Sequence, residues 1–218
     1  MALYPWYLVR GVPLNTTSSV IYSILEWITR FAYVNLLWIL FSLLGVIIVG
    51  FFPSTIAMFA IVRDWIRGDT EKPVFKTFWN YFKAEFWKSN RLGILLMVIV
   101  CIIGIDLWYI QINLNELLTW TYTPLFAFMV LFLLFLFYIF PAFVHYDLKL
   151  LQLIKNAFLI MLINPIHTIL IVLCLGSLYF VMHAVPALAF IFGGSSYAFI
   201  TMWLCLHAFN KIQRKQEK

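Results

Sequence analysis

The sequence predicts an all-α protein that crosses a lipid bilayer about five times and places amphipathic helices along its cytoplasmic interface. Of its 218 residues, 64% are hydrophobic and only 11% are charged, and the mean hydropathy is +0.96. Soluble domains are about half apolar and a quarter charged. A chain of this size cannot hide so much apolar surface in its own core, so the surface must face lipid.

Charge and cysteine content narrow the class further. The net charge of +6 favours an anionic membrane surface, because the cations stand beside apolar runs and among Trp and Phe. No basic helix or RNA-binding signature indicates a nucleic-acid partner. The cysteines, at positions 101, 174 and 205, lie inside apolar runs, which argues against a disulfide framework. No linker divides the chain, so one membrane domain over residues 1–218 is expected.

The first three spans follow from runs of apolar residues. Residues 31–52 contain no charge, and about 20 such residues suffice to cross the hydrocarbon core. The second run covers residues 92–112, and the third covers 124–140 and extends through Val144. Each run is long enough for a membrane helix.

The C-terminal third contains two more spans. No Asp, Glu, Lys or Arg occurs between Lys155 and Lys211. One helix over that interval measures about 80 Å, which is too long for a single crossing. Pro165 and Pro186 break the run. We therefore expect an interfacial helix and two spans, at 147–163, 166–184 and 187–209.

The distribution of basic residues predicts the orientation. Thirteen cations fall between spans one and two, between spans three and four, and after span five, whereas Arg10 and Arg30 fall on the other side. The positive-inside rule then places the C-terminus in the cytoplasm and the N-terminus outside. The outer boundary, where an aromatic belt is expected, then holds Trp108, Tyr109, Trp120 and Tyr122, together with Asp106 and Glu116.

Two parts of the chain share a plan. Phe-Pro pairs end at Pro53 and Pro141, and each precedes an amphipathic segment and then a returning span. This order predicts a parallel repeat of residues 31–112 and 124–184, followed by the final span 187–209. The alternative is two unrelated helical hairpins, each with an interfacial helix.

Residues 74–90 carry the clearest amphipathic pattern. One helical face holds Phe75, Phe78, Trp79, Phe82 and Phe86, and the other holds Lys76, Asn80 and Lys83. Aromatic rings below and lysines above suit the headgroup region of an anionic leaflet.

Two further segments extend this cytoplasmic surface. Ser54 and Thr55 are expected to cap a helix that stops at Gly68, and Asp147 precedes a second amphipathic helix. The surface either anchors the protein in lipid or docks a second protein. The interface residues so predicted are Arg63, Arg67, Phe75, Lys76, Phe78, Trp79, Phe82 and Lys83.

The sequence predicts no catalytic, cofactor-binding or metal-binding residue. It contains no HExxH, GxSxG or phosphate-binding glycine loop, and the histidines are dispersed. Asn35 and Asp106 are the possible intramembrane polar site, since ionisable groups are costly in lipid. Asp106 follows Arg91 by about 22 Å of helix. That distance favours an interfacial carboxylate over a residue on a transport pathway.

Residues 51–96, from FFPSTIAMFAIVRDWIRG through PVFKTFW to SNRLGILL, resemble the YesL-like family of uncharacterised bacterial membrane proteins. Residues 140–162 are similar to the second half of that family. Its members are encoded mainly in Gram-positive bacteria, beside carbohydrate ABC importers and glycan-degrading enzymes. The resemblance therefore implies a role in oligosaccharide uptake and supplies no catalytic residues.

These observations lead to one main functional hypothesis and two alternatives. The first is a non-enzymatic accessory subunit that binds the permease subunits of a carbohydrate ABC importer. The chain has no Walker loop, so it is not the ATPase. An independent small transporter or channel is the alternative, in which Asn35 and Asp106 would be the polar residues of the transport pathway. An enzyme acting on lipid-linked sugar comes third, because no acid–base cluster is present.

Overall fold

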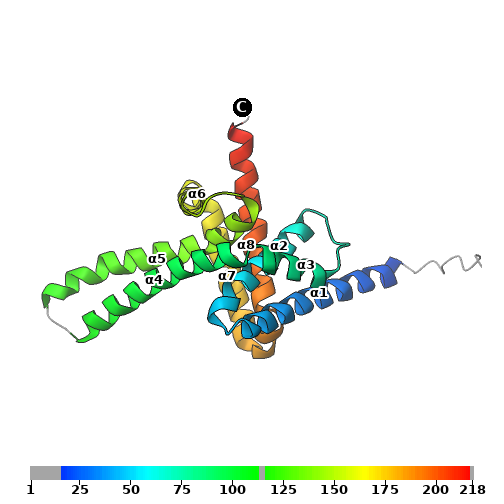
Figure 1. Ribbon diagram of the computed structural model, residues 1–218, viewed down its shortest axis with the longest axis horizontal. Coiled ribbons are helices and arrows are strands. Elements are labelled where there is room, and N and C mark those ends of the chain that lie inside the picture. The colour runs from blue at the N-terminus through cyan, green and yellow to red at the C-terminus, as the bar shows by residue number, and fades with distance from the viewer. Residues whose placement is uncertain (1–15, 113–115, 217–218) are drawn as a thin grey trace, which may run out of the picture.

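The computed structural model describes residues 16–112 and 116–216, and every regular element in these ranges is an α-helix (Figure 1). The helices are α1 (Thr16–Leu44), α2 (Ile48–Ile66), α3 (Val74–Ala84), α4 (Phe86–Ile112), α5 (Glu116–His145), α6 (Leu150–Ile163), α7 (Pro165–Ala184) and α8 (Pro186–Gln216). All except α3 and α6 are long and apolar enough to cross a membrane, which makes six in the described ranges. The all-α polytopic class is confirmed, with six candidate spans where about five were expected.

The additional span arises because the expected single helix over residues 31–52 is wrong. Helix α1 ends at Leu44, and α2 begins at Ile48 and returns alongside it. Gly45 and Gly50 make this reversal possible, since a Cβ on either glycine would collide with the backbone of the other. These glycines therefore serve contact within the chain.

Helix α1 and helix α2 each end in a Schellman turn, with a different residue at the left-handed position. At the end of α2, the amide of Asp69 donates to the carbonyl of Asp64 at 3.0 Å, and Gly68 has φ 94°. At the end of α1, the amide of Ile47 donates to the carbonyl of Ser42 at 2.9 Å, and Val46 has φ 56°. Glycine is usual at this left-handed position, whereas valine is strained there.

Helix α2 forms the centre of the molecule. Within its membrane-length window, 78% of residues are buried, a larger share than in any other candidate span of the described ranges. Helices α1, α4, α5 and α8 all contact it. Residues 54–67 were expected to form a separate interfacial helix capped by Ser54 and Thr55, and this expectation is wrong. Helix α2 continues through Pro53, and the Thr55 hydroxyl instead donates to the carbonyl of Phe51.

The amphipathic segment 74–90 divides at Glu85 into α3 and the first turn of α4. Its aromatic face packs largely against protein, because Phe78 and Phe82 are buried. Phe41 of α1 lies 5.2 Å from both rings, measured between centroids. On the same face, Phe75 is 52% exposed and Trp79 is 39% exposed. The face therefore joins α3 to the core and leaves two rings for lipid.

The α4–α5 pair forms an arm that projects from this core (Figure 1). Only 17% of the membrane-length window of α4 is buried. Ile102, Ile105 and Trp108 are each more than half exposed on its outer half, as is Phe126 on α5. We refer to residues 94–112 and 122–131 as the arm. Its apolar surface is far larger than packing within this chain requires.

The structure contradicts one of the residue placements on which the expected orientation rested. Arg30 was expected on the opposite side of the membrane from the segment between spans one and two, yet its Nη1 donates to the carbonyl of Thr70 at 2.9 Å. Trp27 likewise packs on Trp65, with ring centroids 5.7 Å apart. The beginning of α1 therefore lies at the same end of the molecule as the end of α2. Arg10 lies outside the described residues, as do the side chains of Glu116 and Trp120.

The proposed repeat of residues 31–112 and 124–184, with a final span at 187–209, stays a prediction. The prolines that indicated it occupy unlike positions. Pro53 stands near the beginning of α2, whereas Pro141 stands near the end of α5.

Candidate functional site

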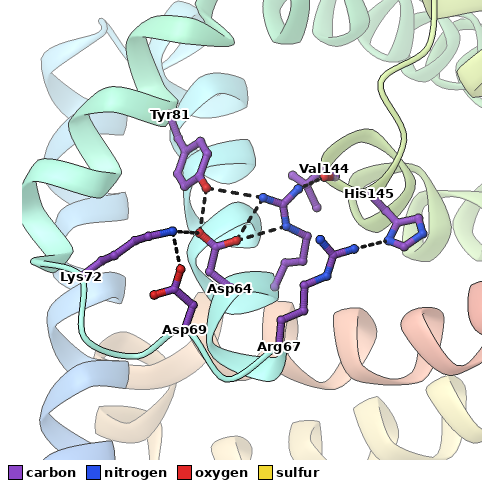
Figure 2. A network of polar contacts seen from close by, with 8 residues as sticks. Asp64, Arg67, Asp69, Lys72, Tyr81, Val144 and His145 are labelled. Atoms are coloured by element: carbon purple, nitrogen blue, oxygen red, sulfur yellow. Dashed lines mark hydrogen bonds and ion pairs between the residues drawn. The ribbon is translucent and has the colours of Figure 1, made fainter.

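The densest polar arrangement in the described chain surrounds Asp64, near the end of α2 (Figure 2). Asp64 is only 8% exposed. Its Oδ1 accepts hydrogen bonds from Arg63 Nη2 at 3.0 Å and Nε at 3.3 Å, and its Oδ2 accepts one from the Tyr81 hydroxyl at 2.7 Å. The carboxylate is thus held by α2 and α3 together. Such charge-assisted bonds offset the cost of removing the carboxylate from water.

Arg63 extends this arrangement to α5. Its Nη1 donates to the carbonyl of Val144, within the last turn of that helix. The last carbonyls of a helix have no partner inside the helix, and the dipole makes this end negative. Arg63 therefore satisfies an orphan acceptor and neutralises Asp64 at the same time. We call Arg63, Asp64, Arg67, Asp69, Lys72, Tyr81 and His145 the Asp64 cluster (Figure 2).

Arg67 and His145 make a second link between α2 and α5. Arg67 Nη2 lies 3.2 Å from His145 Nδ1. A guanidinium has only donors, so this ring nitrogen must accept and the imidazole is neutral. The His145 ring also packs on Phe209 of α8 at 4.9 Å. This end of α8 is thereby joined to the cluster.

The connection between α2 and α3 carries the remaining charges. Lys72 pairs with Asp69, and its Nζ lies 3.8 Å from Asp64 Oδ2. The hydrogen bond to Asp69 raises the pKa of Lys72. Burial, followed by the hydrogen bond to Asp64, raises the pKa of Tyr81. Both groups hold their protons at neutral pH, which keeps their contacts with the carboxylates intact.

A polar cavity of about 250 Å³ adjoins the cluster between α2, α3, α4 and α5. Among the side chains that line it are Arg63, Glu85, Lys88 and His145. Lys88 Nζ donates to Asp147 Oδ1 at 3.1 Å and so closes one side of the cavity. Most of the charges that bound this cavity already pair with neighbouring groups.

The cluster is suited to joining helices. Its carboxylates are neutralised by neighbouring cations, and it contains no Ser, Thr or Cys side chain beside a base. In the part of the chain that the structure describes, no three His, Cys, Asp or Glu side chains converge to hold a metal ion. The geometry fixes the mutual positions of α2, α3, α5 and α8.

Asn35 has a separate and well-defined role inside the bundle. Its Nδ2 donates to the carbonyl of Phe190 at 2.8 Å, and its Oδ1 accepts from the amides of Gly194 at 3.0 Å and Ser195 at 3.2 Å. Residues 190 and 194 are a pair that bond to each other in a regular α-helix. The amide of Asn35 therefore connects α1 to a backbone turn of α8. Gly194 is required here, because a Cβ would meet Asn35 Oδ1 at 2.9 Å.

Asp106 does not join Asn35 in a common site. It is exposed on the arm, whereas Asn35 is buried between α1 and α8. The predicted interface residues also separate into two groups. Arg63 and Arg67 belong to the Asp64 cluster, and Phe78 and Phe82 belong to the core.

The remaining predicted interface residues are available at the surface. Lys76 and Lys83 on α3 are exposed, as are Phe75 and Trp79. Lys83 places its Nζ 5.0 Å from the centroid of the Trp79 ring.

Sequence reasoning missed Tyr81, Lys72 and His145 as members of the cluster. Tyr81 occupies the polar side of a pattern in which only the large apolar rings and the lysines carried a signal. His145 is distant in sequence from α2, and single-sequence periodicity contains no information on which helix ends meet. The one available signal was Asp64 itself, an acid between two arginines in an otherwise apolar helix.

The fold and its polar cluster define an all-helical, multi-pass membrane protein whose helix ends are joined by fixed charges. A family model described as "Protein of unknown function, DUF624" matches residues 31–107. The chain is 37% identical over 189 residues to the uncharacterized protein YteU of Bacillus subtilis (strain 168), covering 87% of this chain and 85% of YteU.

Two further relatives from the same organism agree with this assignment. Identity is 35% over 196 residues with the uncharacterized protein YesL, covering 88% and 90% of the two chains. It is 29% over 204 residues with the uncharacterized protein YesV, covering 94% and 98%. The chain belongs to this DUF624 family of uncharacterised proteins, so the predicted YesL-like resemblance is confirmed. No solved structure matches it.

Proposed function

We propose that this protein is a non-enzymatic accessory membrane subunit of a carbohydrate ABC importer and binds the importer's permease subunits. The observation that carries the proposal is the arm of α4 and α5. Its outer half exposes Ile102, Ile105, Trp108 and Phe126, although the core lies elsewhere. A helix pair that projects in this way offers a long apolar face to a neighbouring membrane helix.

The Asp64 cluster also supports this proposal, because it holds the end of α5 in place. Arg63 and Arg67 tie the end of α2 to the end of α5, which is also the helix that returns from the arm. The base of the arm is therefore rigid relative to α2. A rigid base lets the arm present its apolar face in one orientation, which favours a specific partner over general lipid contact.

The choice of an oligosaccharide importer rests on the family. The YesL-like resemblance implies service to carbohydrate uptake, and the relatives YteU, YesL and YesV are themselves uncharacterised. The class of partner, a carbohydrate importer, is therefore proposed from the family resemblance. The geometry of the arm supports lateral binding to a membrane subunit.

We also propose that the protein lies in the bacterial cell membrane with both ends of the described chain in the cytoplasm. Six crossings return the chain to its starting side, and Arg30 contacts the loop that follows α2. The basic residues around α3, α4 and α6 then face the cytoplasm in accordance with the positive-inside rule. The expected cytoplasmic C-terminus is retained, and the expected external N-terminus is replaced.

Co-purification with the neighbouring permease subunits tests the accessory role. The bulky variant Gly104→Trp should reduce recovery of the permease subunits at least tenfold, because Gly104 lies on the arm and nothing in this chain lies within 4 Å of an added Cβ. Gly176→Trp on α7 is the matched control, because its added Cβ also meets nothing within 4 Å.

Three results would decide against the proposal. Equal recovery with both variants removes the arm as the docking surface. A lone, monodisperse protein, together with unchanged sugar uptake after its deletion, rules out the accessory role. Proton-driven transport by the purified protein supports the alternative of an independent transporter.

A further inference from the structure

A second cavity shares Lys88 and Asp147 with the polar cavity described above, but its other lining residues differ. It measures about 590 Å³ and opens between the first turns of α4 and the segment that leads into α6. Lys88 and Arg91 line it from α4, and Lys149 lines it from the other wall. Asp147 is the one carboxylate among the lining residues.

The charges of this cavity do not cancel. Lys88 pairs with Asp147, and the distance between Nζ and Oδ1 is 3.1 Å. Arg91 and Lys149 have no ion-pair partner in the part of the chain that the structure describes, and both are exposed. Two uncompensated cations on opposite walls of one cavity therefore favour an anion between them.

The apolar lining locates this cavity at the membrane boundary. Trp87 is 75% exposed at its edge, and the apolar run of α4 begins at Leu92 directly after Arg91. Exposed Trp side chains favour the depth of lipid headgroups, where the ring contacts acyl chains and the N–H contacts water. Leu150 provides a further apolar contact on the opposite wall.

From this geometry we propose that the cavity binds the phosphate of one anionic phospholipid, such as phosphatidylglycerol. Arg91 and Lys149 hold the phosphate oxygens from the two walls, with Arg91 able to donate two parallel hydrogen bonds. Trp87 and Leu150 contact the glycerol and the first acyl carbons. Helix α6 begins at Leu150, beside the cavity, without a side-chain cap, and such a helix N-terminus favours an anion. The site is independent of the accessory role proposed above.

Native mass spectrometry of the purified full chain with phosphatidylglycerol or phosphatidylcholine tests this site. We expect one phosphatidylglycerol to remain bound preferentially. The double variant Arg91→Gln/Lys149→Gln should lower its retention by about tenfold or more, because each cation near an anionic lipid contributes about fivefold in affinity. The charge-preserving variant Arg91→Lys/Lys149→Arg should keep most of the retention.

The matched control is Lys155→Gln/Lys211→Gln, which removes the same charge from exposed positions on α6 and α8 outside the cavity. Its retention should equal that of the unmodified protein. An equal loss in both double variants overturns the site and leaves only general attraction to the membrane. Displacement of the lipid by glycerol 1-phosphate overturns the lipid assignment in favour of a soluble phosphate. Monodisperse elution in zwitterionic detergent verifies that each variant is folded.

Discussion

Single residues explain why the α1–α2 reversal was hidden in the sequence. The stop at Gly68 was predicted, and the structure confirms it with φ 94° at this residue. The stop at Val46 was not predicted, because valine lacks the conformational freedom that marks a helix end. A run of apolar residues across positions 43–49 therefore read as one continuous span. Gly45 and Gly50 flank this turn in the sequence, and only the structure shows that they approach each other closely.

Replacement of Val46 by glycine tests the strain at this turn. Val46→Gly should raise the free energy of unfolding by about 1 kcal/mol, since the left-handed conformation costs a side chain about that much. Thermal unfolding in detergent measures it. Val49→Gly, inside α2, is the control and should lower stability. A fall in stability with both glycines would contradict the Schellman geometry at Val46.

The Asp64 carboxylate is expected to contribute strongly to stability. Asp64→Asn removes the charge that Arg63 and Lys72 neutralise and leaves the partly buried Arg63 guanidinium without its counterion. We expect a loss of about 3 kcal/mol. Asp69→Asn changes the same charge at a more exposed position and should cost less than about 1 kcal/mol. Equal losses of stability in the two variants, measured by thermal unfolding, would contradict the larger contribution assigned to Asp64.

Because of Tyr81, the stability of the protein should decrease in the alkaline pH range. Its folded-state pKa is raised above the ordinary 10.0, first by burial and then by the hydrogen bond to Asp64. The raised value means that this contribution is present below pH 10 and is lost as pH rises through the folded-state pKa. The melting temperature should therefore fall above pH 10, and Tyr81→Phe should show a smaller fall. An identical fall in both proteins would exclude Tyr81 as a contributor.

At the scale of elements, apolar runs, proline breaks and one amphipathic pattern located most of the helices. Helices α4, α5, α7 and α8 occupy the apolar runs from which their spans were inferred, and α6 occupies the expected interfacial segment. What periodicity could not supply was the partner of each face. The aromatic stripe of α3 is equally suited to lipid and to protein, and only the position of Phe41 on α1 makes Phe78 and Phe82 part of the core.

Helix α3 provides a direct comparison between its two faces. Phe82→Glu places a charge in a buried position, so it should lower stability by several kcal/mol, about 3 or more. Lys83→Glu alters the exposed neighbour and should cost about 1 kcal/mol of attraction to an anionic surface. The yield of folded, monodisperse protein measures both. Equal yields would mean that the buried face of α3 has been misassigned.

At the scale of the whole molecule, the number of crossings determines which surfaces share a compartment. Single cysteines in a background without Cys101, Cys174 and Cys205 report this topology. Cysteines at Tyr22, Lys76, Lys155 and Lys211 should react from the cytoplasmic side and one at Gln111 from outside. External labelling at position 22, with positions 76 and 211 internal, would restore five crossings.

The burial of α2 has a consequence for how the protein enters the membrane. Among the candidate spans of the described chain, α2 is the least apolar and also the most buried. It carries Arg63 and Asp64, and much of its packing is against α8, which is synthesised more than a hundred residues later. Alone in the insertion channel, such a segment partitions poorly into lipid. The close turn at Gly45 and Gly50 lets α1 and α2 enter the lipid as one packed pair, in which α1 covers part of α2 until α8 has been synthesised.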